Sequence, residues 1–137
     1  MRKPLAAAAV VLLCLTSCET LRHQFAPLAA NWEAKIGQLQ YRGPKTTLIG
    51  EVLVRFSKQG DFELTFTKGP GIPLLVIHQD ANFVRVRGPL ARGTWSGPTY
   101  QAPARLRGWL ALRELLTKAQ KPMVRYSAGA ETFVFEF

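Results

Sequence analysis

Cysteine is scarce in this chain, which contains only Cys14 and Cys18, and both lie near its beginning. A disulfide-stapled fold needs cysteines spread along the sequence, and a thiolate metal site needs several at regular spacing. The sequence after Cys18 offers neither. We therefore expect a folded domain without disulfide bonds or cysteine-bound metal.

Histidine is equally rare, and the motifs of common enzyme classes are missing from the sequence. His23 and His78 stand far apart, and the chain has no H-E-x-x-H zinc motif and no P-loop. Ser57 and Ser96 lack the G-x-S-x-G context of an esterase nucleophile. The sequence predicts no catalytic residue, no metal site and no cofactor.

The sequence also lacks an apolar run long enough to span a bilayer. The run from Leu5 to Leu15 falls short of the roughly 20 residues that a transmembrane helix requires. It follows the cations Arg2 and Lys3 and precedes small residues, which is the order of an export signal. We predict that residues 1–17 are a signal peptide. A buried N-terminal helix with incidental cysteines is the alternative.

The predicted signal ends in "LTSC", residues 15–18, which resembles the lipobox of bacterial lipoproteins. In that motif the chain is cut before the cysteine, which then carries lipid. The resemblance thus implies that Cys14 would leave with the signal and that Cys18 would anchor the protein. Glu19 follows instead of an aspartate, which favours the outer membrane over retention in the inner one. We predict a lipidated tether over residues 18–31 and one domain over residues 32–137, facing the periplasm.

Acidic residues are few, 9 against 18 lysines and arginines, so the net charge is +9. Loss of Arg2 and Lys3 with the signal would leave +7. A face of basic and aromatic residues can indicate nucleic-acid binding, and Arg85, Arg87, Arg92 and Trp95 could form one. Export argues against that partner. Anionic lipid head groups would be closer neighbours of an exported protein. The scattered positions of the basic residues are also typical of a solvated surface.

Hydrophobic residues alternate with polar ones between about Ala34 and Ser96, which predicts half-buried antiparallel strands. The clearest pair is "GEVLVRF" and "DFELTFT", joined by a short segment with Gly60. We expect one shared inner face on these two strands, because a slip of one residue would expose every apolar side chain. That face consists of Val52, Val54, Phe56, Phe62, Leu64 and Phe66.

One segment changes the period from two to that of a helix, from about Pro103 to Ala119. Its apolar residues form a broad arc, and Arg113 falls inside this arc. The strand pattern returns in "MVRY" and "ETFVFEF", which predict a short hairpin. The predicted fold is α+β, an antiparallel meander that forms an incomplete (half) barrel with one covering helix. The apolar arc contains Leu106, Trp109, Leu110, Leu112, Leu115 and Leu116.

The order of several motifs resembles the LolB family of outer-membrane lipoprotein receptors. Trp32 precedes the first strand, and "LQYRG", "FELTFTKGPG" and "ARLRGWL" follow in the family's order, over most of the domain. The resemblance implies a half-barrel around an apolar cavity, with a helical lid. It also implies lipoprotein cargo received from a soluble LolA-like carrier. The chain is shorter than the family after the helix.

The resemblance implies two sites. The inner face, with Trp109 and Leu112, would line a cavity for acyl chains, and Arg113 would be a polar group at its mouth; a solid core is the alternative. The loop with Lys68, Pro70 and Ile72 would contact a membrane or partner, unless Ile72 begins the next strand and points inward.

Two functions from different classes follow. The first is a lipoprotein that binds acyl chains or lipoprotein cargo, which implies a role in lipoprotein localisation. The second is a structural or assembly lipoprotein that binds another envelope protein without a lipid cavity. The sequence leaves the oligomeric state open.

Overall fold

The computed structural model describes residues 23–137, so the predicted signal peptide, Cys18 and the first part of the tether lie outside the described residues. The described residues form an α+β fold with one α-helix and an eight-stranded sheet. Within them, no helix is both long enough and apolar enough to cross a membrane. The strands are β1 (Glu33–Arg42), β2 (Thr47–Phe56), β3 (Phe62–Thr67), β4 (Pro73–Gln79), β5 (Phe83–Gly88), β6 (Gly93–Pro98), β7 (Met123–Ala128) and β8 (Glu131–Glu136).

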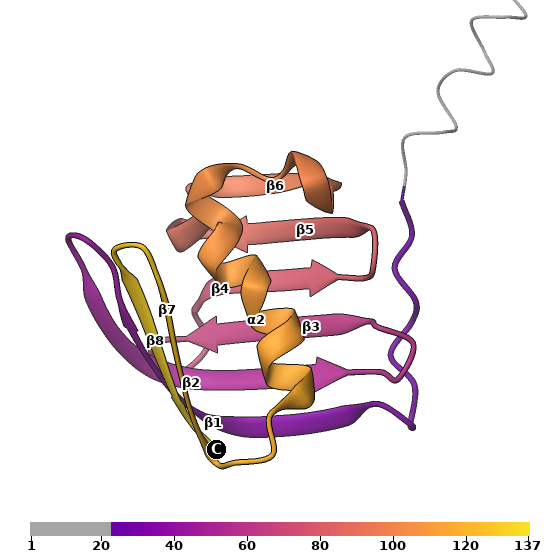
Figure 1. Ribbon diagram of the computed structural model, residues 1–137, viewed down its shortest axis with the longest axis horizontal. Coiled ribbons are helices and arrows are strands. Elements are labelled where there is room, and N and C mark those ends of the chain that lie inside the picture. Colours follow the sequence, from indigo (N-terminus) through magenta and orange to yellow (C-terminus); the bar gives the residue numbers. More distant parts are fainter. Residues whose placement is uncertain (1–22) are drawn as a thin grey trace, which may run out of the picture.

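The sheet is open and antiparallel, with the strand order β6-β5-β4-β3-β2-β1-β8-β7. Its first six strands form the predicted meander, in which each strand pairs with the next along the chain. In Figure 1 the sheet curls, so that the β7–β8 hairpin stands at a steep angle to β3, β4 and β5. Both edge strands, β6 and β7, have one unpaired side within the described part of the chain.

The register between β2 and β3 puts the predicted apolar residues on one face. Val52 pairs with Phe66, Val54 with Leu64, and Phe56 with Phe62. The turn between the strands is closed by a hydrogen bond from Ser57 N to Asp61 O, and Gly60 supplies the positive φ of 100° that this turn needs. The alternation of the sequence thus appears directly as one buried and one wetter face.

The helix α2 (Arg107–Lys118) crosses the concave face of the sheet diagonally (Figure 1). It is shorter than predicted, because residues Ala104–Leu106 form a 3-10 turn, η3, after Pro103. The earlier 3-10 turns are η1 (Pro89–Ala91) and η2 (Thr99–Gln101). The apolar arc faces the sheet: Leu106, Trp109, Leu110, Leu112 and Leu116 are buried, and Leu115 packs half-buried at the side of this core.

The C-terminal hairpin joins the sheet at β1, the edge far from β6. Leu39 pairs with Phe135 and Tyr41 with Phe133, so β8 extends the concave face with two fully buried aromatic rings. The helix carries the chain from the β6 edge to the β1 edge (Figure 1). The predicted short hairpin is present, and it closes the core that the helix covers.

Candidate functional site

The residues predicted to line a cavity form a solid core in this conformation. Val52, Val54, Leu64, Phe66 and Leu112 are 0% exposed, and a side chain without accessible surface borders no space large enough for water. The three others are also buried, at 1% for Phe62, 2% for Trp109 and 7% for Phe56. A ligand can therefore enter between α2 and the sheet only if the helix moves.

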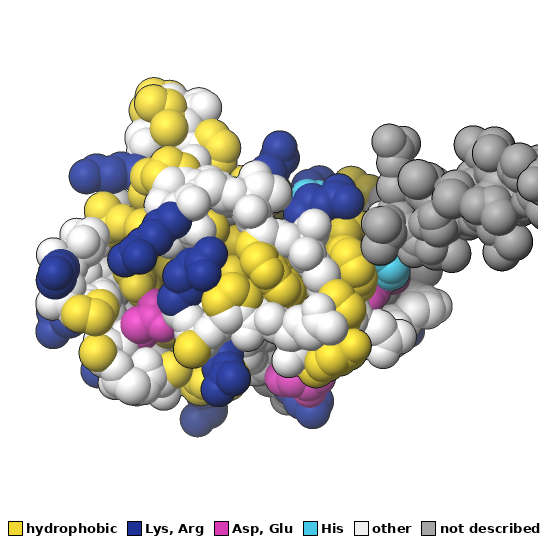
Figure 2. All heavy atoms as spheres, turned by 90° about the horizontal axis from the view of Figure 1, so that it is seen from above, with side chains coloured by type: hydrophobic (Ala, Val, Ile, Leu, Met, Phe, Trp, Pro, Cys, Tyr) yellow, Lys and Arg dark blue, Asp and Glu magenta, His cyan; other side chains and the backbone are white. Residues whose placement is uncertain are grey.

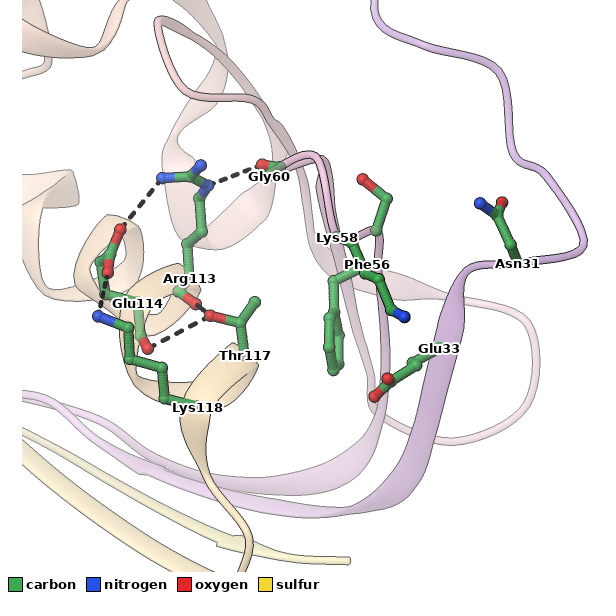
Figure 3. A pocket seen from close by; sticks show the side chains of 10 residues that line it. Asn31, Glu33, Phe56, Lys58, Gly60, Arg113, Glu114, Thr117 and Lys118 are labelled. Carbon is green, nitrogen blue, oxygen red and sulfur yellow. Dashed lines mark hydrogen bonds and ion pairs between the residues drawn. The ribbon is translucent and has the colours of Figure 1, made fainter.

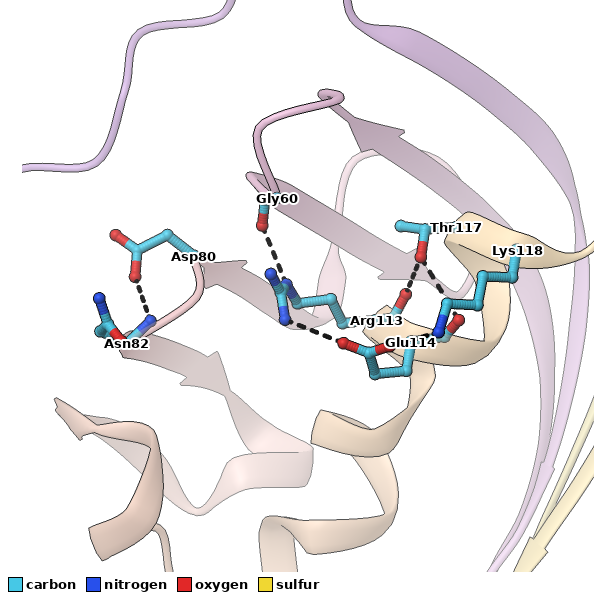
Figure 4. Close-up of polar contacts among 7 residues, drawn as sticks. All are labelled: Gly60, Asp80, Asn82, Arg113, Glu114, Thr117 and Lys118. Carbon is cyan, nitrogen blue, oxygen red and sulfur yellow. Dashed lines mark hydrogen bonds and ion pairs between the residues drawn. The ribbon is translucent and has the colours of Figure 1, made fainter.

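Arg113 lies at the end of the sheet where the chain enters β1, in a pocket of about 330 Å³ that is lined mostly by polar and charged residues (Figure 3). Its Nε donates a hydrogen bond of 2.9 Å to the carbonyl oxygen of Gly60, and its Nη1 lies 3.3 Å from Glu114 Oε1. Figure 4 shows the same contacts from another side, with Lys118 on the second oxygen of Glu114 at 3.1 Å. Arg113 thus ties α2 to the β2–β3 turn and does not border an apolar cavity.

Lys35 is a second tie between α2 and the sheet, and sequence analysis missed it. It lies on β1, and its Nζ donates to the carbonyl oxygens of Leu116 (3.1 Å) and Ala119 (2.9 Å) at the end of the helix. These carbonyls have no partner within a helix, and a cation there also complements the helix dipole. The same Nζ lies 5.7 Å from the ring centroids of Phe56 and Phe137.

We expect Lys35→Met to lower the free energy of unfolding by about 1–3 kcal/mol, because it leaves two carbonyl groups without their charged donor while keeping the apolar stem. Urea unfolding followed by circular dichroism measures this. The matched control is Lys118→Met, whose side chain is 79% exposed and should cost less than about 0.5 kcal/mol. Equal effects of the two variants would contradict the role given to Lys35.

The opposite end of the sheet carries a cleft that borders the core directly. We call it the loop-end cleft; it combines two adjoining pockets of about 360 Å³ each, which share Tyr41, Pro44, Leu90 and Arg92. Its apolar floor includes Tyr41 and Trp109, whose ring centroids are 4.9 Å apart. Its rim includes three cations from three separate segments: Lys45, Arg92 and Arg105.

The acid of the loop-end cleft is Glu131, at the start of β8. Its Oε2 accepts a hydrogen bond of 2.6 Å from the Tyr41 hydroxyl, and burial together with this carboxylate raises the pKa of Tyr41. A Cβ built on Gly108 would lie 2.7 Å from Glu131 Oε1, so the carboxylate sits against the first turn of α2. That turn has no acidic residue of its own, and an anion there is favourable. Glu131 supplies one negative charge against the three cations Lys45, Arg92 and Arg105, so the cleft keeps an excess of positive charge.

The loop with Lys68, Pro70 and Ile72 lies at the same end of the sheet as the loop-end cleft, between β3 and β4 (Figure 1). Every residue from Lys68 to Ile72 is exposed, and Gly69 and Gly71 take positive φ values of 70° and 85°. The strand begins at Pro73, and Ile72 is 64% exposed. Ile72 therefore projects outward, and the alternative that it points into the core does not hold.

On the face seen in Figure 2, the cations are scattered and do not form one patch. Figure 2, which views the molecule from above, shows dark blue Lys and Arg side chains spread among hydrophobic and neutral ones, with fewer acidic groups. Among residues 23–137, no three His, Cys, Asp or Glu side chains are placed to hold a metal ion. The loop-end cleft combines an apolar floor with a cationic rim. Another pocket, beside β7, also places Lys118, Lys121 and Arg125 next to Met123 and Val124.

No protein-family model and no curated protein matches the chain. The sequence predicted Trp109 as a site residue but missed Tyr41, Lys45, Arg92, Arg105 and Glu131. The alternation of Leu39 and Tyr41 in the first strand is a signal from which Tyr41 could have been predicted to face inward. The other four come from turns and strand ends, where no periodic pattern shows which residues will meet.

Proposed function

We propose that the protein is a LolB-like outer-membrane lipoprotein, anchored by lipid on Cys18 and facing the periplasm. Its sheet is an incomplete barrel that binds acyl chains or lipoprotein cargo beneath α2, with a role in lipoprotein localisation. The observation that carries the proposal is the loop-end cleft, because its floor is the core itself. Widening the cleft at Trp109 and Tyr41 would open the interior to an acyl chain.

The attachment of α2 favours opening at this end. Both ties, Arg113 to Gly60 and Lys35 to Leu116 and Ala119, hold the later half of the helix. The earlier half, which borders the cleft, is preceded by Pro103 and the short turns η2 and η3. Movement of the helix about its tied end would separate Trp109 from Tyr41 and admit a chain from the rim.

The apolar floor and the cationic rim of the loop-end cleft indicate the chemical class of the ligand. An acyl chain fits an apolar floor, and Lys45, Arg92 and Arg105 fit an anionic head group, so the expected ligand class is an anionic amphiphile. An attached carboxylate or phosphate would meet these cations at the entrance, while the chain replaced contacts among the core side chains. No metal and no cofactor takes part in this proposal.

The test compares two fluorescent probes, dansyl-undecanoic acid and the uncharged N-phenylnaphthylamine, with the protein in detergent-free buffer at low salt. We expect Arg92→Glu with Arg105→Glu to weaken binding of the acid roughly tenfold, since two rim charges are reversed, and to leave the uncharged probe unaffected. Arg87→Glu with Arg125→Glu is the matched control, because it reverses two exposed charges outside the cleft. Equal loss for both probes would contradict a head-group role of the rim.

A second function is favoured by the solid core. With five of the predicted cavity residues at 0% exposure, the domain can also act as a structural or assembly lipoprotein that binds another envelope protein through its surface. Native mass spectrometry of the protein extracted from membranes separates the two. Bound lipid of one mass class supports the cavity; a well-folded protein that carries no lipid and binds neither probe supports the second function.

A further inference from the structure

The N-terminal segment is bound to the sheet before the first strand begins. His23 stacks on Phe83 with ring centroids 4.3 Å apart and planes at 15°, and its Nε2 lies 2.5 Å from Asp80 Oδ2. Phe25 lies beside them, with its centroid 6.0 Å from that of Phe83 and the Arg85 guanidinium 5.4 Å above its ring. Two side chains of the predicted tether are thus fixed by aromatic, polar and cation–π contacts.

The binding place is on the outer face of the sheet, at the turn between β4 and β5. Phe83 and Arg85 alternate with Val84 and Val86, which are 0% exposed in the core, so the segment lies on the face away from α2. Within the turn, Asp80 Oδ1 accepts from the backbone N–H groups of Asn82 (2.9 Å) and Phe83 (2.8 Å), and Figure 4 shows the first of these.

The turn therefore holds Asp80 in place and leaves its second oxygen for His23. Burial alone would raise the pKa of this carboxyl, but the two backbone donors and the His23 ring together lower it below its ordinary value. The carboxylate is thus charged at neutral pH, ready to accept from His23.

Docking of this segment changes how far the domain can move from Cys18. Only four residues separate Cys18 from His23, so the docked chain reaches at most about 18 Å. If the segment were released, the free chain would extend from Cys18 to Glu33, a reach of about 50 Å. The contact therefore decides between a short and a long connection to the lipid.

The docking place and the loop-end cleft lie at opposite ends of the strands. Asp80 follows the end of β4, whereas Ile72 precedes its start, and the seven residues of β4 span about 20 Å. Figure 1 shows the N-terminal segment on one side of the sheet and the β3–β4 loop on the other. A short connection from Cys18 to the β4–β5 end of the domain would keep that end close to the bilayer. The opposite end, with the loop-end cleft, would then face the aqueous side.

We propose that His23 and Phe25 form a strap that holds the β4–β5 end of the domain next to its membrane and presents the loop-end cleft and Ile72 to the aqueous side. Release of the strap gives the cleft end the reach to meet the bilayer. The inference rests on the proposed lipid anchor at Cys18, and it predicts that Ile72 contacts the anchoring membrane only after release.

The test uses the full-length lipidated protein in vesicles of phosphatidylethanolamine and phosphatidylglycerol (3:1) that contain brominated lipid as a quencher. A bimane label is placed on Ala81→Cys, in the β4–β5 turn, or on Lys68→Cys, in the far loop; both positions are exposed. We expect at least threefold stronger quenching at position 81 than at position 68. His23→Ala with Phe25→Ala should remove this difference, and Leu28→Ala, an exposed residue of the same segment, should keep it.

Equal quenching at both positions with the natural strap, or a difference that persists in the double variant, overturns the strap while the anchor stands. Flotation of the vesicles gives a separate readout of the anchor. A protein that does not float with them overturns the proposed lipid anchor, and the strap with it. Circular dichroism shows that each variant is folded.

Discussion

Trp109→Ala is expected to lower the free energy of unfolding by about 3–5 kcal/mol, a large part of the stability of a domain of this size. The indole is 2% exposed and lies between three aromatic rings, with centroid distances of 4.9 Å to Tyr41, 4.9 Å to Phe133 and 6.1 Å to Phe66. Its removal leaves a void that these rings, on separate strands of one sheet, cannot fill together. Urea unfolding followed by circular dichroism gives the midpoint and its slope.

The control for this variant is Tyr100→Ala, an aromatic truncation at a residue that is 84% exposed. It should change stability by less than about 0.5 kcal/mol. If Trp109→Ala costs less than about 1 kcal/mol, the ring does not fill the space between α2 and the sheet, and the core is looser than the structure shows. Restored stability on addition of dansyl-undecanoic acid would show that the void accepts an acyl chain.

Cys18→Ala is expected to abolish membrane attachment, because the proposed anchor is the lipid on this residue. Each buried methylene contributes roughly 0.8 kcal/mol, so several acyl chains hold a protein firmly, whereas the described residues have no spanning helix to replace them. The measurement is fractionation of cells into soluble, inner-membrane and outer-membrane material. The variant should accumulate as unprocessed or soluble protein.

Cys14→Ala is the matched control, since the proposed cut before Cys18 removes Cys14 with the signal. Its attachment and its processed mass should equal those of the unaltered protein. Unchanged attachment of Cys18→Ala would show that the protein is not anchored as a lipoprotein at this residue. Attachment of the unaltered protein to the inner membrane would leave the anchor intact and contradict the outer-membrane assignment drawn from Glu19.

The sequence by itself determined the strands of the meander, the shared inner face of β2 and β3 and the buried side of α2. Each of these depends on a period, because a strand or helix with one apolar face has only one orientation that buries it. The burial of Val52, Phe66 and Leu112 follows from that rule. For Ile72 the sequence allowed either an exposed or an inward-pointing side chain, and the structure shows that it is exposed.

The tertiary structure alone decided which edge the last hairpin joins, whether the interior is filled, and which turns meet. Pairing of β8 with β1 depends on where α2 delivers the chain, and the zero exposure of the inner face depends on volumes summed over many elements. Three of the contacts join segments that are distant in sequence. Lys35 binds Leu116, 81 residues away, Glu131 binds Tyr41, 90 residues away, and His23 binds Asp80, 57 residues away. Such contacts leave no periodic pattern in the chain, because they form only after the folded sheet brings its ends and faces into place.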